Sequence, residues 1–182
     1  MYKIIKDGYL SFDLLEETGL VIQAFTTRNG GVSPAPFDTL NLGFNTGEDP
    51  ELIRINHQRI ARTLGVDSHQ IVRGEQVHGL DIQVVTQQNQ GGVWKPEQVL
   101  PQTDGLITNQ PGVMLASYYA DCVPILLLDP RQKAIALLHA GWKGTAGKIA
   151  ALGVRALQKN LQASGRLRPL RRMRDGLSAR RP

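Results

Sequence analysis

Cysteine is nearly absent from this sequence, in which Cys122 is the only one among 182 residues. No disulfide can therefore form within the chain, and the thiol is left as a packing group, a nucleophile or a metal ligand. Long hydrophobic runs are absent too, because the longest apolar stretch, around Val123–Leu128, is far too short to cross a membrane. The first ten residues lack the apolar core of a secretion signal, so we expect a soluble cytoplasmic protein without a membrane partner.

Aromatic residues are scarce at 5%, and the net charge of +5 is concentrated at one end of the chain. Residues 165–182 hold seven arginines and one aspartate, which leaves 14 basic and 15 acidic groups in residues 1–164. The basic tail has no aromatic side chain on which a base could stack, so we expect no specific nucleic-acid partner. Pro169 and Gly176 break its pattern, and we expect it to be disordered.

The remaining 164 residues are long enough for one hydrophobic core, and we expect a single α/β domain there. Asp49, Pro50 and Glu51 form a helix-start signal, and Gly65 marks its end. A second helix is predicted after Thr145, which is a good N-cap, with an apolar face of Ile149, Ala150, Val154, Leu157 and Leu161. Strands are predicted at 21–27, 81–86, 103–108, 113–117, 125–128 and 134–138.

His139 ends the apolar run 134–138 and is followed by a turn that contains Gly141 and Gly144. Loops at the carboxyl end of a sheet strand are where α/β proteins place ligands, and helix N-termini favour anions. This position therefore suits a functional histidine. Taken alone, it suits a core histidine satisfied by backbone groups equally well.

Two further residues with metal-binding or nucleophilic side chains occupy comparable positions. His78 lies in a glycine-marked turn, and Cys122 opens the strand that precedes 134–138. Two imidazoles and one thiolate make a tetrahedral zinc set with one open position, as catalytic zinc requires. We therefore predict that His78, Cys122 and His139 converge on one metal. A nucleophilic Cys122–His139 pair is the competing chemical interpretation.

Five short motifs closely resemble the YfiH/YlmD-type family, whose members are described as laccase-domain or multicopper polyphenol oxidase proteins and as purine nucleoside phosphorylases. In chain order they span residues 27–33 (TRNGGVS), 41–43 (NLG), 76–79 (QVHG), 120–124 (ADCVP) and 139–144 (HAGWKG). The resemblance covers about residues 20–163. It implies an α/β fold with a layered mixed β-sheet core and flanking helices. It also implies a zinc ion, with copper as the alternative, held by His78, Cys122 and His139.

The same resemblance implies further site residues. Asn41 and Arg59 would act in catalysis beside the metal ligand Cys122. Arg28 and Gln76 would contact the substrate, and Lys143 could attract phosphate. Simpler roles exist for two of them, since Arg59 on a helix and Lys143 in a turn suit solvent-exposed charges.

The implied activity is that of a zinc-dependent purine nucleoside phosphorylase, with a purine nucleoside and phosphate as its partners. Adenosine, inosine and methylthioadenosine would be substrates, with adenosine deaminase as a side activity. The alternatives are a copper-dependent polyphenol oxidase and a Cys–His hydrolase. A multicopper oxidase needs many histidines, and this chain has only His57, His69, His78 and His139. We expect a monomer or a weak homo-oligomer.

The carboxyl end departs from the family pattern. Family members continue after the helix that follows the HAGWKG motif with a Gly-Pro-containing strand and further elements, whereas this chain has the arginine-rich run. We therefore expect a truncation or a change of reading frame near Ser164. The catalytic domain, residues 1–164, would then lack its C-terminal part, including one wall of the pocket, and residues 165–182 would be a non-family tail.

Overall fold

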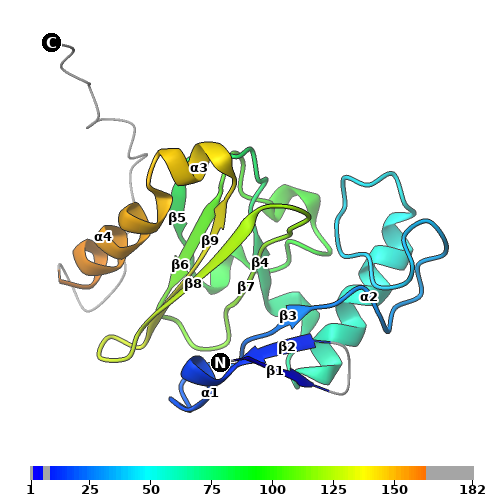
Figure 1. The fold of residues 1–182 in the computed structure, drawn as a ribbon, viewed down its shortest axis with the longest axis horizontal. Helices are drawn as coiled ribbons and strands as arrows, with labels where there is room; N and C mark the ends of the chain where they lie inside the picture. The colour runs from blue at the N-terminus through cyan, green and yellow to red at the C-terminus, as the bar shows by residue number, and fades with distance from the viewer. Residues whose placement is uncertain (1, 6–8, 163–182) are drawn as a thin grey trace, which may run out of the picture. The chain divides into compact units, whose positions relative to one another are not determined.

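A computed structural model describes residues 2–5 and 9–162, so the basic tail predicted at 165–182 lies outside the described residues. The chain forms two compact units (Figure 1). The first comprises the described residues up to Ile71 together with Gly91–Pro96. The second comprises Val72–Gln90 and the described residues from Glu97 on. The expectation of one domain over residues 1–164 stays a prediction. No described helix is long and apolar enough to span a membrane.

The first unit contains a small antiparallel sheet and one long helix. Strands β1 (Tyr2–Ile5), β2 (Tyr9–Phe12) and β3 (Phe25–Thr26) pair in that order. The short helix α1 (Asp13–Glu16) follows β2, and the 3-10 helix η1 (Ser68–Gln70) follows α2 (Pro50–Thr63). The strand predicted at 21–27 is shorter than expected, because only Phe25 and Thr26 pair with β2.

Helix α2 has the ends that its sequence predicts. The Asp49 carboxylate accepts a hydrogen bond from the Glu51 N–H at 2.9 Å, and Pro50 occupies the first helical position. Gly65 follows the helix with φ of +69°, a conformation that favours glycine. Local capping chemistry therefore defines both ends of this helix.

The buried Asn56 of α2 organises the glycine-rich loop that precedes the helix. Its side-chain N–H groups donate to Ser33 Oγ at 2.8 Å and to the Asn41 carbonyl at 2.9 Å. Its Oδ1 accepts from the Val32 N–H at 2.9 Å. One fully buried amide thus holds the two ends of the loop against the helix.

The second unit is built on a mixed four-stranded sheet in the order β5-β6-β9-β8. Its strands are β5 (Ile82–Val84), β6 (Gly105–Thr108), β8 (Val123–Asp129) and β9 (Ala134–Ala140). β5 and β6 are parallel, whereas β6–β9 and β8–β9 are antiparallel. A separate pair joins β4 (Ile71–Arg73) and β7 (Met114–Ala116), and η2 (Gln87–Asn89) and η3 (Pro96–Gln98) lie in the excursion between β5 and β6. The α/β class with a mixed sheet is confirmed.

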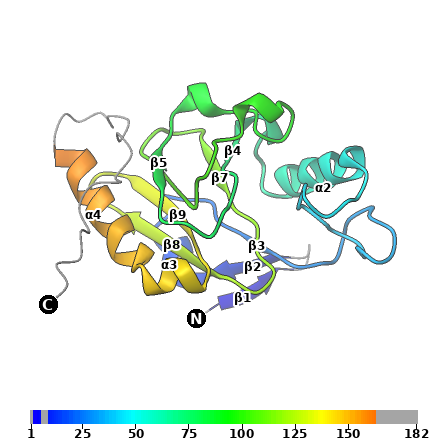
Figure 2. The ribbon, with the colours of Figure 1, turned by 90° about the horizontal axis from the view of Figure 1, so that it is seen from above.

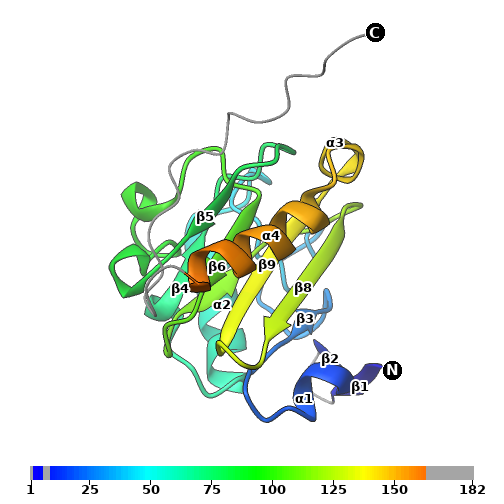
Figure 3. The same ribbon diagram turned by 90° about the vertical axis from the view of Figure 1, so that its left-hand side faces the viewer.

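Two helices follow β9, and the longer one covers the sheet. Figures 2 and 3 show α3 (Trp142–Ala146) at the end of β9 and α4 (Ile149–Gln162) lying across one sheet face. The residues of α4 that pack against the core are Ile149, Gly153, Ala156 and Leu157. Their spacing follows one helical face. The predicted face was partly wrong, since Ala150 is exposed and Val154 is 43% exposed.

The prediction that Thr145 caps the second helix is also wrong. Thr145 lies inside α3, whose N-cap is Gly141. The helical path breaks at Gly147 and Lys148, where Lys148 has φ of +61°. A Cβ at Gly147 would come within 2.6 Å of the Leu80 side chain, so close packing fixes the break at this glycine.

Leu138 of β9 lies between two glycines in the core of this unit. A Cβ at Gly153 would come within 2.5 Å of Leu138 Cδ1, and one at Gly105 within 2.8 Å of Leu138 Cδ2. Leu138 is completely buried and has no solvent side to which it could move. The two glycines therefore provide the space for this leucine.

We expect Gly153→Ala to destabilise the protein by about 1 kcal/mol. Overpacking costs about 1–3 kcal/mol, while alanine gains about 1 kcal/mol over glycine inside a helix. Urea unfolding measures the difference. Val154→Ala on the exposed side of α4 should stay within about 0.5 kcal/mol of the parent. A Gly153→Ala protein at least as stable as the parent would contradict this account of Leu138.

Candidate metal centre

The structure brings together the three residues predicted to bind metal. One donor atom each from His78, Cys122 and His139 lie within 4.8 Å of one another. Zinc bonds of about 2.0–2.3 Å in a tetrahedral site separate ligand atoms by about 3.5 Å, so a small side-chain movement would close the set around one ion. Two nitrogens and one sulfur with a fourth position open form the donor set of a catalytic zinc site.

Strand pairing places Cys122 beside His139. In the β8–β9 hairpin, Pro124 pairs with His139 and Val123 pairs with Ala140. Continuing this pattern by one residue sets Cys122 opposite Gly141. A Cβ at Gly141 would come within 3.2 Å of Cys122 Sγ and within 2.7 Å of His78 Cδ2. Glycine at position 141 therefore lets two ligands approach the backbone closely.

His78 comes from the turn between β4 and β5 and has a left-handed backbone with φ of +61°. That conformation is uncommon for a residue with a side chain, although histidine is among the residues that adopt it more often. The turn is held by the Asp104 carboxylate. It accepts hydrogen bonds from the N–H groups of Val77, His78 and Gly79 at 3.3, 2.9 and 2.7 Å.

His139 is anchored by the same aspartate. Its Nδ1 lies 2.8 Å from Asp104 Oδ1, and its backbone N–H donates to the Asp104 carbonyl at 2.7 Å. Both side chains are buried, at 3% and 0% exposure. Asp104 was predicted only as part of the strand at 103–108, with no role in the site. The sequence did contain a signal for this role. An aspartate immediately before the apolar strand Gly105–Thr108 is expected to be buried, and a buried aspartate almost always has hydrogen-bond or charge partners.

Tyr119 packs against His139. The Tyr119 ring lies 5.6 Å from the His139 ring, and its hydroxyl donates to the Leu138 carbonyl at 3.1 Å. Burial raises the pKa of Tyr119 to about 12, so the phenol stays protonated at neutral pH. Burial also raises the pKa of Tyr118.

Gln76, a predicted substrate contact, fixes the segment that leads to Cys122. Its side-chain N–H donates to the Tyr118 carbonyl, and its Oε1 accepts from the Tyr118 N–H, both at 2.8 Å. These two bonds imitate a backbone ladder. They use both ends of the amide within the protein, so the role of Gln76 toward a substrate stays a prediction.

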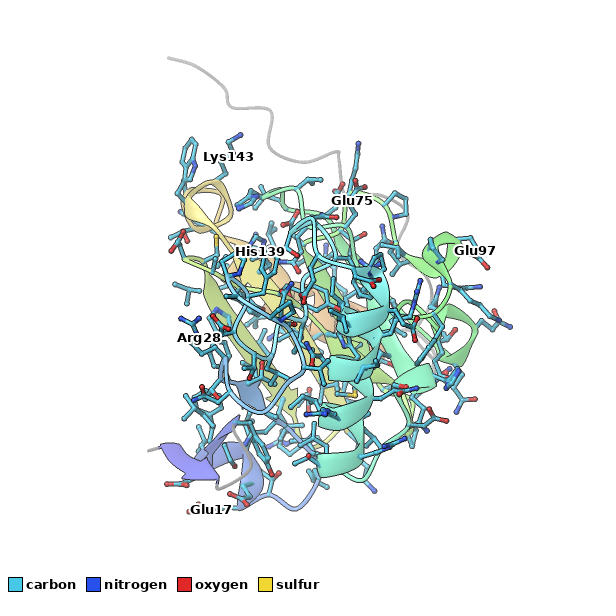
Figure 4. All side chains as sticks on the ribbon, turned by 90° about the vertical axis from the view of Figure 1, so that its right-hand side faces the viewer. Glu17, Arg28, Glu75, Glu97, His139 and Lys143 are labelled. Carbon is cyan, nitrogen blue, oxygen red and sulfur yellow. The ribbon has the colours of Figure 1, made fainter. Side chains whose placement is uncertain are left out.

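Exposed apolar side chains flank the predicted ligands in sequence. Val77, Val123 and Trp142 are next to or near the three ligands in sequence and are 45%, 59% and 75% exposed. The Lys143 ammonium lies 5.5 Å from the Trp142 ring centroid. Figure 4 shows Lys143 pointing outward, whereas His139 lies in the interior. Lys143 is thus an exposed cation on the turn after β9, and its contact with phosphate stays a prediction.

The other predicted site residues, Arg28, Asn41 and Arg59, belong to the first unit. Arg28 Nε donates to the Asp38 carbonyl at 2.7 Å, and Arg59 Nη1 donates to the carbonyls of Gly30 and Gly31 at 3.1 and 3.3 Å. Asn41 donates to Thr46 Oγ1 and Glu48 Oε2 and accepts from the Gly43 N–H. All three side chains hold the loop that contains the TRNGGVS and NLG motifs, and their catalytic or substrate-binding roles stay predictions.

The remaining two histidines also belong to the first unit and have other partners. His57 Nε2 lies 3.1 Å from the Leu42 carbonyl, and its ring stacks on Phe44. His69 contacts the Asp67 carboxylate and stacks on Trp94. Among the described residues, one His/Cys/Asp/Glu group has the geometry to hold a metal.

Sequence relatives of the chain carry phosphorylase names. Purine nucleoside phosphorylase YlmD of Geobacillus stearothermophilus is 43% identical over 130 residues, which are 71% of this chain and 47% of that protein. Purine nucleoside phosphorylase YlmD of Bacillus subtilis is 40% identical over 130 residues, again 71% of this chain and 47% of that protein. Purine nucleoside phosphorylase ORF3 of Streptomyces griseus is 40% identical over 140 residues, 77% of this chain and 55% of that protein. The chain thus spans about half the length of these relatives.

Solved structures and a family model agree with these similarities. The crystal structure of the hypothetical protein YfiH of Bacillus licheniformis superposes with a TM-score of 0.82 at 35% identity, over 87% of this chain and 58% of that one. The crystal structure of YlmD from Geobacillus stearothermophilus superposes with a TM-score of 0.81 at 38% identity. The superposition covers 86% of this chain and 58% of that one. The model described as multi-copper polyphenol oxidoreductase laccase matches residues 22–168. This chain therefore belongs to the laccase-like YfiH/YlmD family.

Proposed function

We propose that the chain is a zinc-dependent purine nucleoside phosphorylase of the YfiH/YlmD type. The observation that carries the proposal is the convergence of His78, Cys122 and His139 in a chain whose relatives are named purine nucleoside phosphorylases. In this reaction a phosphate oxygen bonds to the ribose anomeric carbon as the glycosidic C–N bond breaks. The purine leaves with the bonding electrons and takes up a proton.

The donor set favours zinc over the copper centres of an oxidase. Two imidazoles and a thiolate suit either a catalytic zinc or a single blue-copper ion, but oxygen reduction by multicopper oxidases needs a cluster with many more histidines. His57 and His69 are engaged with other groups. Zinc in a three-ligand site supplies Lewis-acid chemistry at its open position, and that chemistry would also support deamination of adenosine.

The residues of the chain have separate roles in this proposal. Arg28 and Arg59 are exposed, and each donates to carbonyls of the glycine-rich loop through one guanidinium nitrogen. Each guanidinium has further N–H donors that would serve an anion such as phosphate. Lys143 adds a cation on the turn after β9. Asn41 would act in catalysis, and Gln76 would contact the substrate beside the Tyr118 segment that it holds.

Nucleoside cleavage with and without phosphate tests the assignment. The zinc-loaded protein should convert inosine to hypoxanthine and ribose 1-phosphate, and it should convert adenosine likewise, only when phosphate is present. Base release without phosphate would identify a hydrolase, and oxygen consumption with a phenol would identify an oxidase. If the zinc-loaded protein leaves every purine nucleoside intact in the presence of phosphate, the assignment fails.

The same assay can be run on a chimera, because the part that this chain matches is 47% of the length of the two YlmD relatives. The chimera carries the remaining part of Geobacillus YlmD. We expect it to cleave inosine faster than the chain alone while binding the same amount of zinc, because no metal ligand differs. An equal rate would show that the remaining part adds nothing to turnover.

A further inference from the structure

We propose that Asp104 is the positioning residue of the metal centre, and that this one carboxylate holds the His78 turn and presents Nε2 of His139 to the metal. The inference rests on the metal-binding part of the proposed function and not on the identity of the substrate. Asp104 touches two of the three metal ligands, although it is not in a position to be a ligand itself because its oxygens are already engaged.

The hydrogen bonds of Asp104 divide between its two oxygens. Oδ1 accepts from the His78 N–H at 2.9 Å and faces His139 Nδ1 at 2.8 Å. Oδ2 accepts from the Gly79 N–H at 2.7 Å and the Val77 N–H at 3.3 Å. Four donors converge on a carboxylate whose side chain is 0% exposed. These hydrogen bonds satisfy the carboxylate without water and restrain its rotation.

This arrangement fixes which nitrogen of His139 binds metal. A carboxylate oxygen accepts hydrogen bonds, so His139 Nδ1 carries the proton and Nε2 keeps its lone pair. Outer carboxylates of this kind orient histidine ligands in many metal sites, and their loss typically weakens metal binding by about 10–100-fold. Here the same carboxylate also holds the left-handed backbone of the second histidine ligand.

Asparagine is the most informative replacement because it keeps the shape of aspartate but offers only one acceptor oxygen. If its NH₂ takes the Oδ2 position, it faces the N–H groups of Val77 and Gly79. If it takes the Oδ1 position, it faces the His78 N–H and donates to His139 Nδ1, which then places the ring proton on Nε2. Either orientation breaks a contact that the centre needs.

We expect Asp104→Asn in the full chain to weaken zinc binding by about 10–100-fold in a competition titration with a chelating dye. Its cobalt(II) complex should show weaker visible ligand-field bands, because the ligands no longer form a compact tetrahedral set. Asp81→Asn is the matched control. It removes the same charge from the same region, and its carboxylate makes no hydrogen bond within the described residues, so zinc affinity should stay within about twofold.

A folded Asp104→Asn protein with zinc affinity within about threefold of the parent and an unchanged cobalt spectrum would overturn the proposal. Histidine NMR of the unmutated protein gives a second test that does not depend on how the variant folds. In ¹⁵N-labelled zinc protein, His139, assigned through His139→Gln, should show a protonated Nδ1 and a metal-bound Nε2. The opposite assignment would also overturn the proposal. Neither measurement involves nucleosides, so failure of the phosphorylase assignment would leave both results interpretable.

Discussion

Cys122→Ala should remove both the metal and the phosphorolysis of purine nucleosides. In the proposed centre the thiolate is one of three ligands from the described residues. We therefore expect zinc affinity to fall by more than the roughly 10–100-fold that loss of an outer hydrogen-bond partner costs. Atomic emission after gel filtration measures bound zinc, and the inosine assay measures turnover. Because Cys122 is the only cysteine, the reactivity of the thiol in the unmutated protein also reports on metal binding. Its single thiol should react slowly with a disulfide reagent when zinc is present and faster after chelation.

Cys122→His is the companion variant, because imidazole replaces the thiolate with another zinc ligand. It should keep part of the zinc affinity that Cys122→Ala loses. The Cys122→Ala variant also distinguishes a metal ligand from a catalytic nucleophile at this position. If Cys122→Ala keeps stoichiometric zinc but loses activity, Cys122 acts as a nucleophile with His139 and not as a metal ligand.

Gly141→Ala should damage the centre through a single methyl group. The new Cβ would lie 2.7 Å from His78 Cδ2, and the ring must move by roughly 0.7 Å to restore an ordinary contact of 3.4 Å. It would also press on Cys122 Sγ at 3.2 Å. Misplacement on this scale costs about 100-fold in rate at a catalytic site, and we expect zinc affinity and inosine turnover to fall together.

The backbone of Gly141 does not explain this sensitivity, since its φ of −71° and ψ of 179° suit any residue. Gly144→Ala, three residues later, is therefore the matched control. A Cβ there would have ordinary contacts of 3.4 Å and beyond, within a helix that favours alanine. It should bind zinc as the parent does. Equal zinc affinity in Gly141→Ala and Gly144→Ala would contradict the proposed crowding.

The sequence made the meeting of Cys122 and His139 predictable. One residue opens a strand, the other ends the next strand, and Asp129–Pro130 marks a turn between them. Adjacent antiparallel strands joined by a short turn bring such positions together. The ends of α2 were predictable for a similar reason, because Asp49, Pro50 and Gly65 act through neighbouring backbone groups.

The approach of His78 to this pair does not follow from any local pattern. It depends on β5 lying parallel to β6 and on a buried aspartate that binds a turn far away in sequence. The break between α3 and α4 is also a tertiary effect. Thr145 is a good cap by itself, but the packing of Gly147 against Leu80 and of Gly141 against two ligands decides where the helices begin.

The hairpin that carries Cys122 and His139 has a consequence for insertions and deletions. Its turn lies at the opposite end of the strands from α3 (Figure 1), where Asp129 Oδ1 accepts hydrogen bonds from the N–H groups of Arg131 and Gln132. Side chains alternate between the faces of a strand, so an insertion or deletion here that shifts β8 by one residue against β9 would direct the thiol to the wrong face. The register set at this turn therefore matters to the metal centre, although the turn lies at the other end of the strands.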